Sequence, residues 1–573
     1  MNAIVSLLFF AAAVRAAVPD PVIPPGTALV QTWTGAAVNQ YLEKWDSSII
    51  PGVTDPFDTA KPVYEVTPAR ALNYVRLYAP AGGSNPMGSW MMSAHEVRGR
   101  TPQQLRDIFA LPALPTNIVQ VRVPAGSQYG LWTGIAGPIA GWGDGGAQQT
   151  KVISKRNDPS SPADPANFAG YTWLPGDSYV NGQGLDYKAL TYTRLLHTGN
   201  PGTMAVYLDL FNPEDGTDLA DVYTTLDYIN YGSDPGPLAA ALRQISPERF
   251  DALSTVGLRN DLLLADSLLE RGRDRRRAAK KAKTGVWMQG IGENGTQKEA
   301  AARTGFDYDS EGFAAGFDRE IKPGFFLGLA AAGLKNRVNW TNAGGFATQD
   351  AERLAFYAGG FKPNAFFELS VTGGLNQTTA QRALSFTGHG YNTTAGAEVI
   401  DLSIRRTAAS RQNGGSLSSH LQAGAVTRLL GLEAASLGRL SYFDLRQNAF
   451  TESGAGSLDL HVNSFRAQTL RAELRLSLSR DFLLSKGRSL KPEVSAGWAR
   501  SAAMDTRRLS AGLSDQREAV TISGDRALAD RFLAGAGLSA ELGKYFSLFA
   551  RCEAETGSGF NFRSAKLGLR CGF

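Results

Sequence analysis

Strict alternation of apolar and polar residues near the C-terminal end constrains the fold more than any other feature of the chain. Residues 564–573 read SAKLGLRCGF, in which apolar side chains take every second position. Lys566 and Arg570 lie between them, on the opposite face. Strand side chains point alternately to two faces, so this pattern predicts a strand with one apolar face. The run FSLFARCEA from Phe546 alternates likewise, and Gly-Ser-Gly at 557–559 predicts the turn that joins the two strands.

The run TLRAELRLSLS at 469–479 indicates which kind of sheet these strands form. Its leucines alternate with Arg471, Glu473 and Arg475. A soluble sandwich would bury the apolar face against a second sheet, whereas a membrane barrel turns that face to lipid and leaves charges in a wet lumen. Residues 285–573 have room for about 12 strands of about 9 to 11 residues. We therefore predict a transmembrane antiparallel β-barrel of about 12 strands, with a soluble sandwich or barrel as the alternative.

Three segments of this half resemble a known family. They are GVWMQGIGENG from Gly285, FDYDSEGFAAGFDREI from Phe306 and the closing LGLRCGF. Together they resemble the translocator barrel of classical autotransporters, which are type V secretion proteins. The resemblance implies that the barrel lies in the outer membrane and exports an N-terminal passenger to the cell surface or beyond. It also implies two partners, outer-membrane lipid and the barrel-assembly machinery, which would read a signal that includes Phe573.

Composition sets further bounds. The chain has 573 residues, of which 43% are hydrophobic, so several packed domains are expected. A net charge of +5 is modest for this length and indicates no nucleic-acid partner. Cys552 and Cys571 fall on the predicted lipid-facing side of neighbouring strands, and a cross-strand disulfide between them stays open because register cannot be derived from sequence. No apolar run reaches about 18 residues, so no transmembrane helix is expected.

The first half divides by composition. The apolar run IVSLLFFAAAV before Ala16 predicts a signal peptide at 1–16, and a buried helix is the alternative. The α+β passenger module is expected at 17–151, because NYVRLY and IVQVRV read as strands and TPQQLRDIFALP as a capped helix. For 152–236 we predict a linker, centred on the Pro- and Ser-rich stretch at 155–170, and a β-rich second passenger module that includes MAVYLDLF.

Residues 237–284 are predicted to be a lumen helix and a basic linker. Residues 238–271 show helical periodicity, and Ser-Pro-Glu at 246–248 is a helix-start signal. In autotransporters a helix in this position threads the lumen and plugs it; an ordinary core helix is the alternative. The run RGRDRRRAAKKAK at 271–283 is expected near the periplasmic mouth, where acidic lumen groups or lipid headgroups could pair with it.

The sharpest feature of the passenger is GIAGPIAGWGDGGAQQT at 134–150. With NYVRLY and VRVPAG upstream, it resembles secreted NAD glycohydrolases of the necrotizing-toxin type (TNT-like), which are related in fold to ADP-ribosyltransferases. The physical requirements agree with that resemblance. Glycines allow close backbone approach and present N–H groups to phosphate, arginine holds a diphosphate, an aromatic ring stacks on nicotinamide, and an amide binds ribose hydroxyls.

The resemblance implies a role for each candidate residue. Arg76 would hold the diphosphate and Trp142 would line the nicotinamide side, while Gly145 and Gly146 would form the ligand-binding turn. Gln149, or less favourably Gln148, would hold the ribose whose glycosidic bond breaks. A further candidate for steadying that ribose is Ser89 in GSWMM. NAD is thus an expected substrate; no cofactor and no metal site are predicted.

Other observations oppose catalysis. The family places a histidine on the strand that reads NIVQV here, but this chain has Asn117 near that position, and His95 lies elsewhere. Trp142 could instead be a core residue, the glycines plain turn residues, and the two glutamines an exposed strand end. The rival function is an adhesin, a surface-displayed binding passenger without catalysis. If the passenger is a toxin, an immunity protein is a further expected partner. For either function, a host or target-cell surface is also an expected partner.

Overall fold

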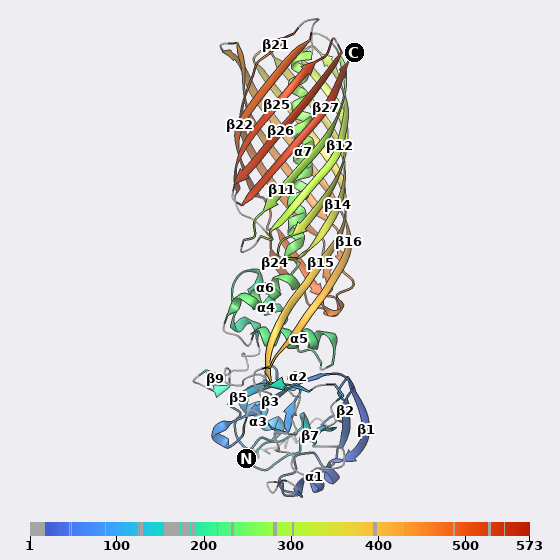
Figure 1. The fold of residues 1–573 in the computed structure, drawn as a ribbon, viewed down its shortest axis with the longest axis vertical. Coiled ribbons are helices and arrows are strands. Elements are labelled where there is room, and N and C mark those ends of the chain that lie inside the picture. Colours follow the sequence, from blue (N-terminus) through green and yellow to red (C-terminus); the bar gives the residue numbers. More distant parts are fainter. Residues whose placement is uncertain are drawn as a thin grey trace, which may run out of the picture. The chain divides into compact units, whose positions relative to one another are not determined.

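The computed structural model describes residues 18–573 with the exception of 45, 47–48, 86–87, 124, 127–129, 154–171, 174–179, 182–183, 186–190, 215, 231–233, 279–282, 301–302, 393–397, 430, 485–487, 525–528, 544 and 558. The predicted signal peptide and the Pro-rich stretch at 155–170 lie outside the described residues, as does part of the basic run. The chain forms two compact units (Figure 1). The N-terminal unit comprises Met1–Arg194, Phe211–Ser233 and Thr387–Leu402, and the barrel unit comprises Leu195–Leu210, Asp234–Phe386 and Ser403–Phe573.

The barrel unit is built on a closed antiparallel sheet of 12 strands, which confirms the predicted fold class. The first strand, β11, pairs with the last, β27, and β20 pairs with β22 to complete the ring. In chain order the strands are β11 Thr284–Gln297, β12 Phe306–Lys322, β13 Phe325–Trp340, β14 Gly345–Lys362, β15 Ala365–Asn392, β16 Glu398–Leu429, β17 Leu432–Gln447, β20 Phe465–Ser479, β22 Ser489–Ala503, β25 Ala529–Glu541, β26 Phe546–Gly557 and β27 Phe560–Gly572. The two-residue β21 Phe482–Leu483 pairs with β22.

Smaller elements complete the barrel unit. A separate sheet of four strands has the order β18-β19-β23-β24, with bounds Phe450–Thr451, Leu460–Val462, Arg508–Leu513 and Val520–Ser523. The short 3-10 helix η7 spans Gly456–Leu458.

The two faces of the barrel strands follow the predicted alternation. In β20, Leu474 is 60% exposed, whereas its neighbours Glu473 and Arg475 are buried. In β27, Leu567 is exposed and Lys566 is buried. At these positions the apolar side chains therefore face outward and the charged ones inward, and the sheet closes on itself rather than packing on a second sheet.

The register excludes the cross-strand disulfide that the sequence left open. Cys571 stands opposite Phe546, and Cys552 stands opposite Ala565. Both thiols are free. The two cysteines do lie on neighbouring strands, but at different heights along them.

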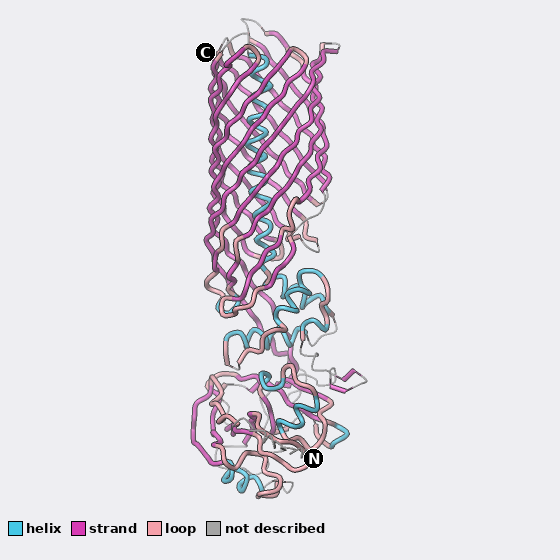
Figure 2. The backbone as a smooth tube through the Cα atoms, turned by 180° about the vertical axis from the view of Figure 1, so that it is seen from behind, coloured by secondary structure: helices cyan, strands magenta, loops and turns pink. Residues whose placement is uncertain are grey.

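A long helix runs inside the barrel. It is α7, Asp251–Ala278, and both backbone views show it within the ring of strands (Figures 1 and 2). It follows α6, Pro235–Ile245, and the short 3-10 helix η6, Pro247–Phe250. The predicted helix start is confirmed, because the Ser246 hydroxyl accepts a hydrogen bond from the Glu248 N–H at 3.2 Å. Within the described ranges no helix is both long and apolar enough to span a membrane.

The N-terminal unit contains an eight-stranded sheet of order β1-β2-β6-β7-β4-β3-β5-β8. These strands span Thr27–Thr34, Pro62–Pro68, Gly130–Ile135, Gln148–Ile153, Trp90–Met92, Leu72–Tyr78, Asn117–Val123 and Thr172–Trp173, in that order across the sheet. The helices α1 Gly35–Glu43, α2 Ala94–Val97 and α3 Pro102–Phe109 accompany it, with the 3-10 helices η1 Pro80–Gly82 and η5 Tyr192–Arg194. Helix α3 begins with a capping box between Thr101 and Gln104. Its Phe109 packs with Leu77, Met92 and Ala147 in one of the cores of the sheet.

The prediction of a β-rich second module is wrong for much of that segment. The two-residue strands β9 Val180–Asn181 and β10 Gly184–Leu185 do pair, but the rest of the described segment is mainly helical. The run MAVYLDLF begins inside helix α4, Gly199–Leu208, and α5 follows at Asp218–Asn230. Helix α4 is buried on most sides, including Met204 and Tyr207. A short apolar run buried all round has no helical periodicity to distinguish it from a strand, which explains the error.

Candidate functional site

Three of the predicted site residues line one cavity in the N-terminal unit. Arg76 comes from β3, Gln149 from β7, and Trp142 from the loop between β6 and β7. The cavity has a volume of about 220 Å³. Its other walls include Trp90, Met92, Tyr78, Phe109, Leu111, Ile139 and Asp46. The site is thus a largely apolar pocket with a few polar groups that converge on it, which is typical of small-molecule sites.

Arg76 is held by two backbone carbonyls. Its Nε donates to the Asn85 oxygen at 3.0 Å and its Nη1 to the Trp90 oxygen at 2.9 Å. Burial lowers the pKa of Arg76 to about 10, and the nearby Tyr78 opposes this shift. Among the described residues no carboxylate lies within 4 Å of the guanidinium. Arg76 is therefore a largely buried cation without an acidic partner in that part of the chain.

The two neighbouring glutamines point to different places, as strand alternation requires. The buried Gln149 lies on the cavity and donates from Nε2 to the Pro56 oxygen at 2.6 Å. Gln148 instead binds Val22 of the N-terminal arm twice, accepting from its N–H at 2.7 Å and donating to its oxygen at 2.9 Å. Gln149 is the glutamine available to a ligand in the cavity, and Gln148 fixes the arm.

The two turn glycines have a conformational role. Gly145 and Gly146 have φ of 68° and 102°, which side chains disfavour. Their N–H groups donate to the backbone oxygens of Asp107 and Ala136, both at 2.9 Å. These amides are therefore engaged within the fold, and the predicted use of their N–H groups for phosphate has no support from this geometry.

The region contains a cation that sequence reasoning missed. Lys151 is only 2% exposed, and its Nζ donates to the Ser89 Oγ at 2.8 Å and lies 4.7 Å from the centre of the Trp90 ring. Burial lowers the pKa of Lys151 to about 8. The negative charge of Asp46 acts to raise this pKa, and the positive charge of Arg76 acts to lower it further. The signal was present in the sequence, because Lys151 follows Gln149 by two positions on a strand and so shares its face.

The two residues that bear on the missing family histidine do not line the cavity. Asn117, near the position of the family histidine, stands opposite Tyr78 in β5 and accepts from the Thr116 hydroxyl at 2.8 Å. The His95 Nδ1 lies 3.0 Å from the Asn212 oxygen, away from the cavity lining. The described part of the chain has no cluster of three or more His, Cys, Asp or Glu residues that could hold a metal ion.

A second set of polar contacts connects helix α7 to the barrel wall. Arg259 reaches Glu293 of β11 at 2.5 Å and Glu555 of β26 at 2.7 Å. Three further pairs join the helix to other strands: Arg271 with Asp318 at 2.7 Å, Asp261 with Arg353 at 2.5 Å, and Asp266 with Arg439 at 2.5 Å. These buried pairs fix the helix in the lumen at several heights.

Comparison with known families identifies the barrel. Residues 286–553 match the family model described as the autotransporter beta-domain. Residues 286–553 form an autotransporter β-domain. The barrel accordingly lies in the outer membrane, and the N-terminal unit is displayed on the cell surface or secreted.

Solved autotransporter structures resemble the β-domain. The translocator domain of NalP from Neisseria meningitidis is 18% identical, with a TM-score of 0.40 over 55% of this chain and 98% of that one. The beta domain of Bordetella BrkA is 16% identical, with a TM-score of 0.36 over 51% of this chain and 100% of that one. The transport unit of Escherichia coli AIDA-I is 14% identical, with a TM-score of 0.32 over 50% of this chain and 90% of that one. A search of curated proteins gave no match. The family match covers none of the N-terminal cavity residues.

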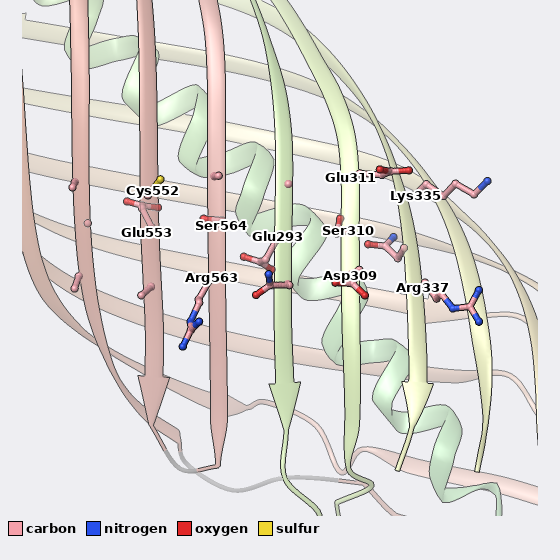
Figure 3. Close-up of a pocket in the computed structure, with 18 of the residues that line it drawn as sticks. Glu293, Asp309, Ser310, Glu311, Lys335, Arg337, Cys552, Glu553, Arg563 and Ser564 are labelled. Atoms are coloured by element: carbon pink, nitrogen blue, oxygen red, sulfur yellow. The ribbon is translucent and has the colours of Figure 1, made fainter. Parts of the chain in front are cut away.

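The outward face of the autotransporter β-domain changes from apolar to charged along the strands. On β12, Phe313 and Phe317 are exposed apolar residues, whereas Asp309 and Glu311 are exposed acids. Glu311 stands opposite Lys335 of β13 in the register, and Figure 3 shows these residues on neighbouring strands. Charged outward positions mark where strands leave the hydrocarbon band. Strands β12 and β13 thus extend beyond the hydrocarbon layer of the membrane.

Proposed function

We propose that the N-terminal unit, exported by the β-domain, cleaves NAD between nicotinamide and ribose. One observation carries this proposal: Arg76, Trp142 and Gln149, far apart in sequence, line the same cavity. The other predicted site residues do not line it: Gln148, Ser89, Gly145 and Gly146. A surface-displayed binding domain without catalysis is the competing function.

The charge of the cavity supports an anionic ligand. Arg76, a half-buried cation that lines the cavity, has no carboxylate within 4 Å in the described ranges. Burial of a charge is costly unless a partner offsets it. A diphosphate bound at Arg76 would supply that partner, and a planar guanidinium suits phosphate oxygens.

The proposed reaction needs no metal. The glycosidic bond breaks as positive charge develops on the ribose, and groups that hold the ribose hydroxyls and stabilise that charge lower the barrier. The bond from Gln149 Nε2 to Pro56 orients the amide, so that its oxygen can accept from a ribose hydroxyl. Trp142 is half-buried and would contact the nicotinamide ring. Asn117 stands in place of the family histidine, so the reaction would proceed without that group.

Release of nicotinamide from NAD by the full-length protein in detergent tests this proposal. Gln149→Ala should lower the rate on the order of a hundredfold, as expected for one positioned hydrogen-bonding group. Gln148→Ala is the matched control and should keep the rate, because its side chain binds Val22. Arg76→Lys should raise KM more than it lowers kcat, since it keeps the charge but loses the planar fork. EDTA should have no effect.

Two outcomes would oppose the proposal. A folded protein that neither releases nicotinamide nor gains thermal stability with NAD would favour the adhesin. Hydrolysis that survives Gln149→Ala would keep the activity and remove the proposed site.

The proposed partners follow from export and activity. The β-domain would meet outer-membrane lipid and the barrel-assembly machinery. As a toxin or effector, the N-terminal unit would act on a host or target cell. A producing cell would then need an immunity protein.

A further inference from the structure

Ser89 and Lys151 form a pair that the proposed NAD chemistry does not use. Ser89 is partly exposed and lies just before β4, whereas Lys151 is buried on β7. The Lys151 Nζ is 2.8 Å from the Ser89 Oγ. Two backbone contacts hold Ser89 close to Lys151. Trp90 stands opposite Lys151 in the strand register, and the Val152 N–H donates to the backbone carbonyl oxygen of Ser89 at 2.7 Å.

Burial favours the neutral form of Lys151 and lowers its pKa to about 8. The Trp90 ring, whose centre lies 4.7 Å from Nζ, attracts the charged form and opposes this shift. The charged groups that act on Lys151 are Arg76, which lowers the pKa further, and Asp46, which raises it. Glu65 of β2 lies on the same face of the sheet as Lys151, but strand β6 with Trp132 separates the two residues. The Glu65 carboxylate accepts a hydrogen bond from the Trp33 ring N–H at 2.9 Å. A buried amine of this kind can serve as a general base near neutral pH.

A positive group adjoins the serine. The Arg76 guanidinium packs against Gly88, where an added Cβ would lie 2.3 Å from its Cζ. A side chain at position 88 would collide with the guanidinium, so glycine at this position allows Arg76 to lie beside Ser89. Nε and Nη1 of Arg76 bind carbonyls, and no hydrogen bond of Nη2 occurs within the described part of the chain. That nitrogen could donate to an oxygen that becomes negative near Ser89.

We propose that Ser89 and Lys151 form a nucleophile and general base for acyl transfer, with carboxylic esters as the substrate class. A nucleophile within hydrogen-bond reach of a base that a third group orients is the recurring arrangement for such chemistry, and serine with lysine is one of its variants. Here the Trp90 ring and the strand register orient the lysine. Neither Ser89 nor Lys151 lines the cavity proposed for NAD, but the pair adjoins Arg76, which does.

The reaction balances without a further reactant. The Ser89 Oγ forms a bond to the ester carbonyl carbon while its proton passes to the neutral Lys151 amine. The tetrahedral intermediate then releases the alcohol, which takes that proton from Lys151. Water attacks the acyl-serine with Lys151 again as base, and the departing Oγ recovers a proton as the carboxylic acid leaves.

Covalent labelling of the full-length protein in detergent with a fluorophosphonate tests the pair. Peptide mapping should find the adduct on Ser89, and Ser89→Ala should abolish it. The rate should rise about tenfold per pH unit below pH 8 and level off above it, because only the neutral amine accepts the proton. Lys151→Arg keeps the positive charge but cannot deprotonate, so it should lower the rate at least a hundredfold; Lys151→Met should do the same. Ser93→Ala and Lys61→Met are controls and should leave it unchanged.

Thermal unfolding of each variant separates lost chemistry from lost folding. A wild-type protein that melts cooperatively but gains no adduct on Ser89 at pH 9 overturns the proposal. So does a Ser89 adduct whose rate shows no dependence on pH between 6 and 9, because such a serine has no titrating base. If both lysine variants unfold, this pH profile of the wild type decides the question.

Discussion

Glu555 is the residue on which the charges of the lumen converge. Its carboxylate accepts from Arg259 at 2.7 Å, from Arg471 at 2.9 Å and from Arg531 at 2.7 Å. All four side chains are buried. Removal of one member of a buried charge cluster leaves the others uncompensated, which is far more costly than loss of a surface pair.

We expect Glu555→Gln to destabilise the barrel by about 3 to 5 kcal/mol. The measurement is the temperature at which the folded barrel loses its distinct migration in detergent gels. Arg466→Ala is the control, because Arg466 is half-exposed in its pair with Asp444, and it should shift that temperature little. Equal shifts in the two variants would show that the lumen cluster is not a major source of stability.

At the scale of elements, helix α7 occupies the lumen of the barrel (Figures 1 and 2). A ring of 12 strands encloses more space than its own side chains fill, and the helix occupies it with charged pairs to several strands. The helix is polar because its surroundings are a charged wall rather than lipid. This is why a segment of low apolarity is buried in a membrane protein.

Deletion of 251–271 should convert the barrel into an open pore. The expected result is a step increase in conductance of single proteins in planar bilayers, because water and ions can then pass through the lumen. Glu270→Ala, which removes one contact with Arg551, is the control and should leave the barrel closed. The same conductance with and without the helix would mean that other segments close the lumen.

At the scale of the whole molecule, the N-terminal unit is expected outside the cell. The β-domain lies in the outer membrane, so the N-terminal unit should be accessible from outside. Proteinase K added to intact cells should degrade the part of the N-terminal unit that precedes Leu195 and leave a protected fragment that contains 285–573. Cells with a permeabilised outer membrane and uninduced cells are the controls. An N-terminal unit degraded only after permeabilisation would contradict export.

The sequence by itself determined the character of the barrel strands. Leu474 and Arg475 show their faces in the sequence, because a strand sends successive side chains to opposite sides in any tertiary context. The helix start at Ser246 and the capping box at Thr101 were likewise legible, since both depend on residues within one turn. Local patterns thus sufficed wherever the deciding contacts are local.

Only the tertiary structure decided which residues meet. It decided that Gln149 rather than Gln148 faces the cavity, brought Arg76 beside Gly88, and placed Lys151 against Ser89. It also made α4 a helix where a short apolar run allowed either form. These outcomes depend on strand register and on packing between segments far apart in the chain, and the energies of such contacts leave no local trace in the order of the amino acids.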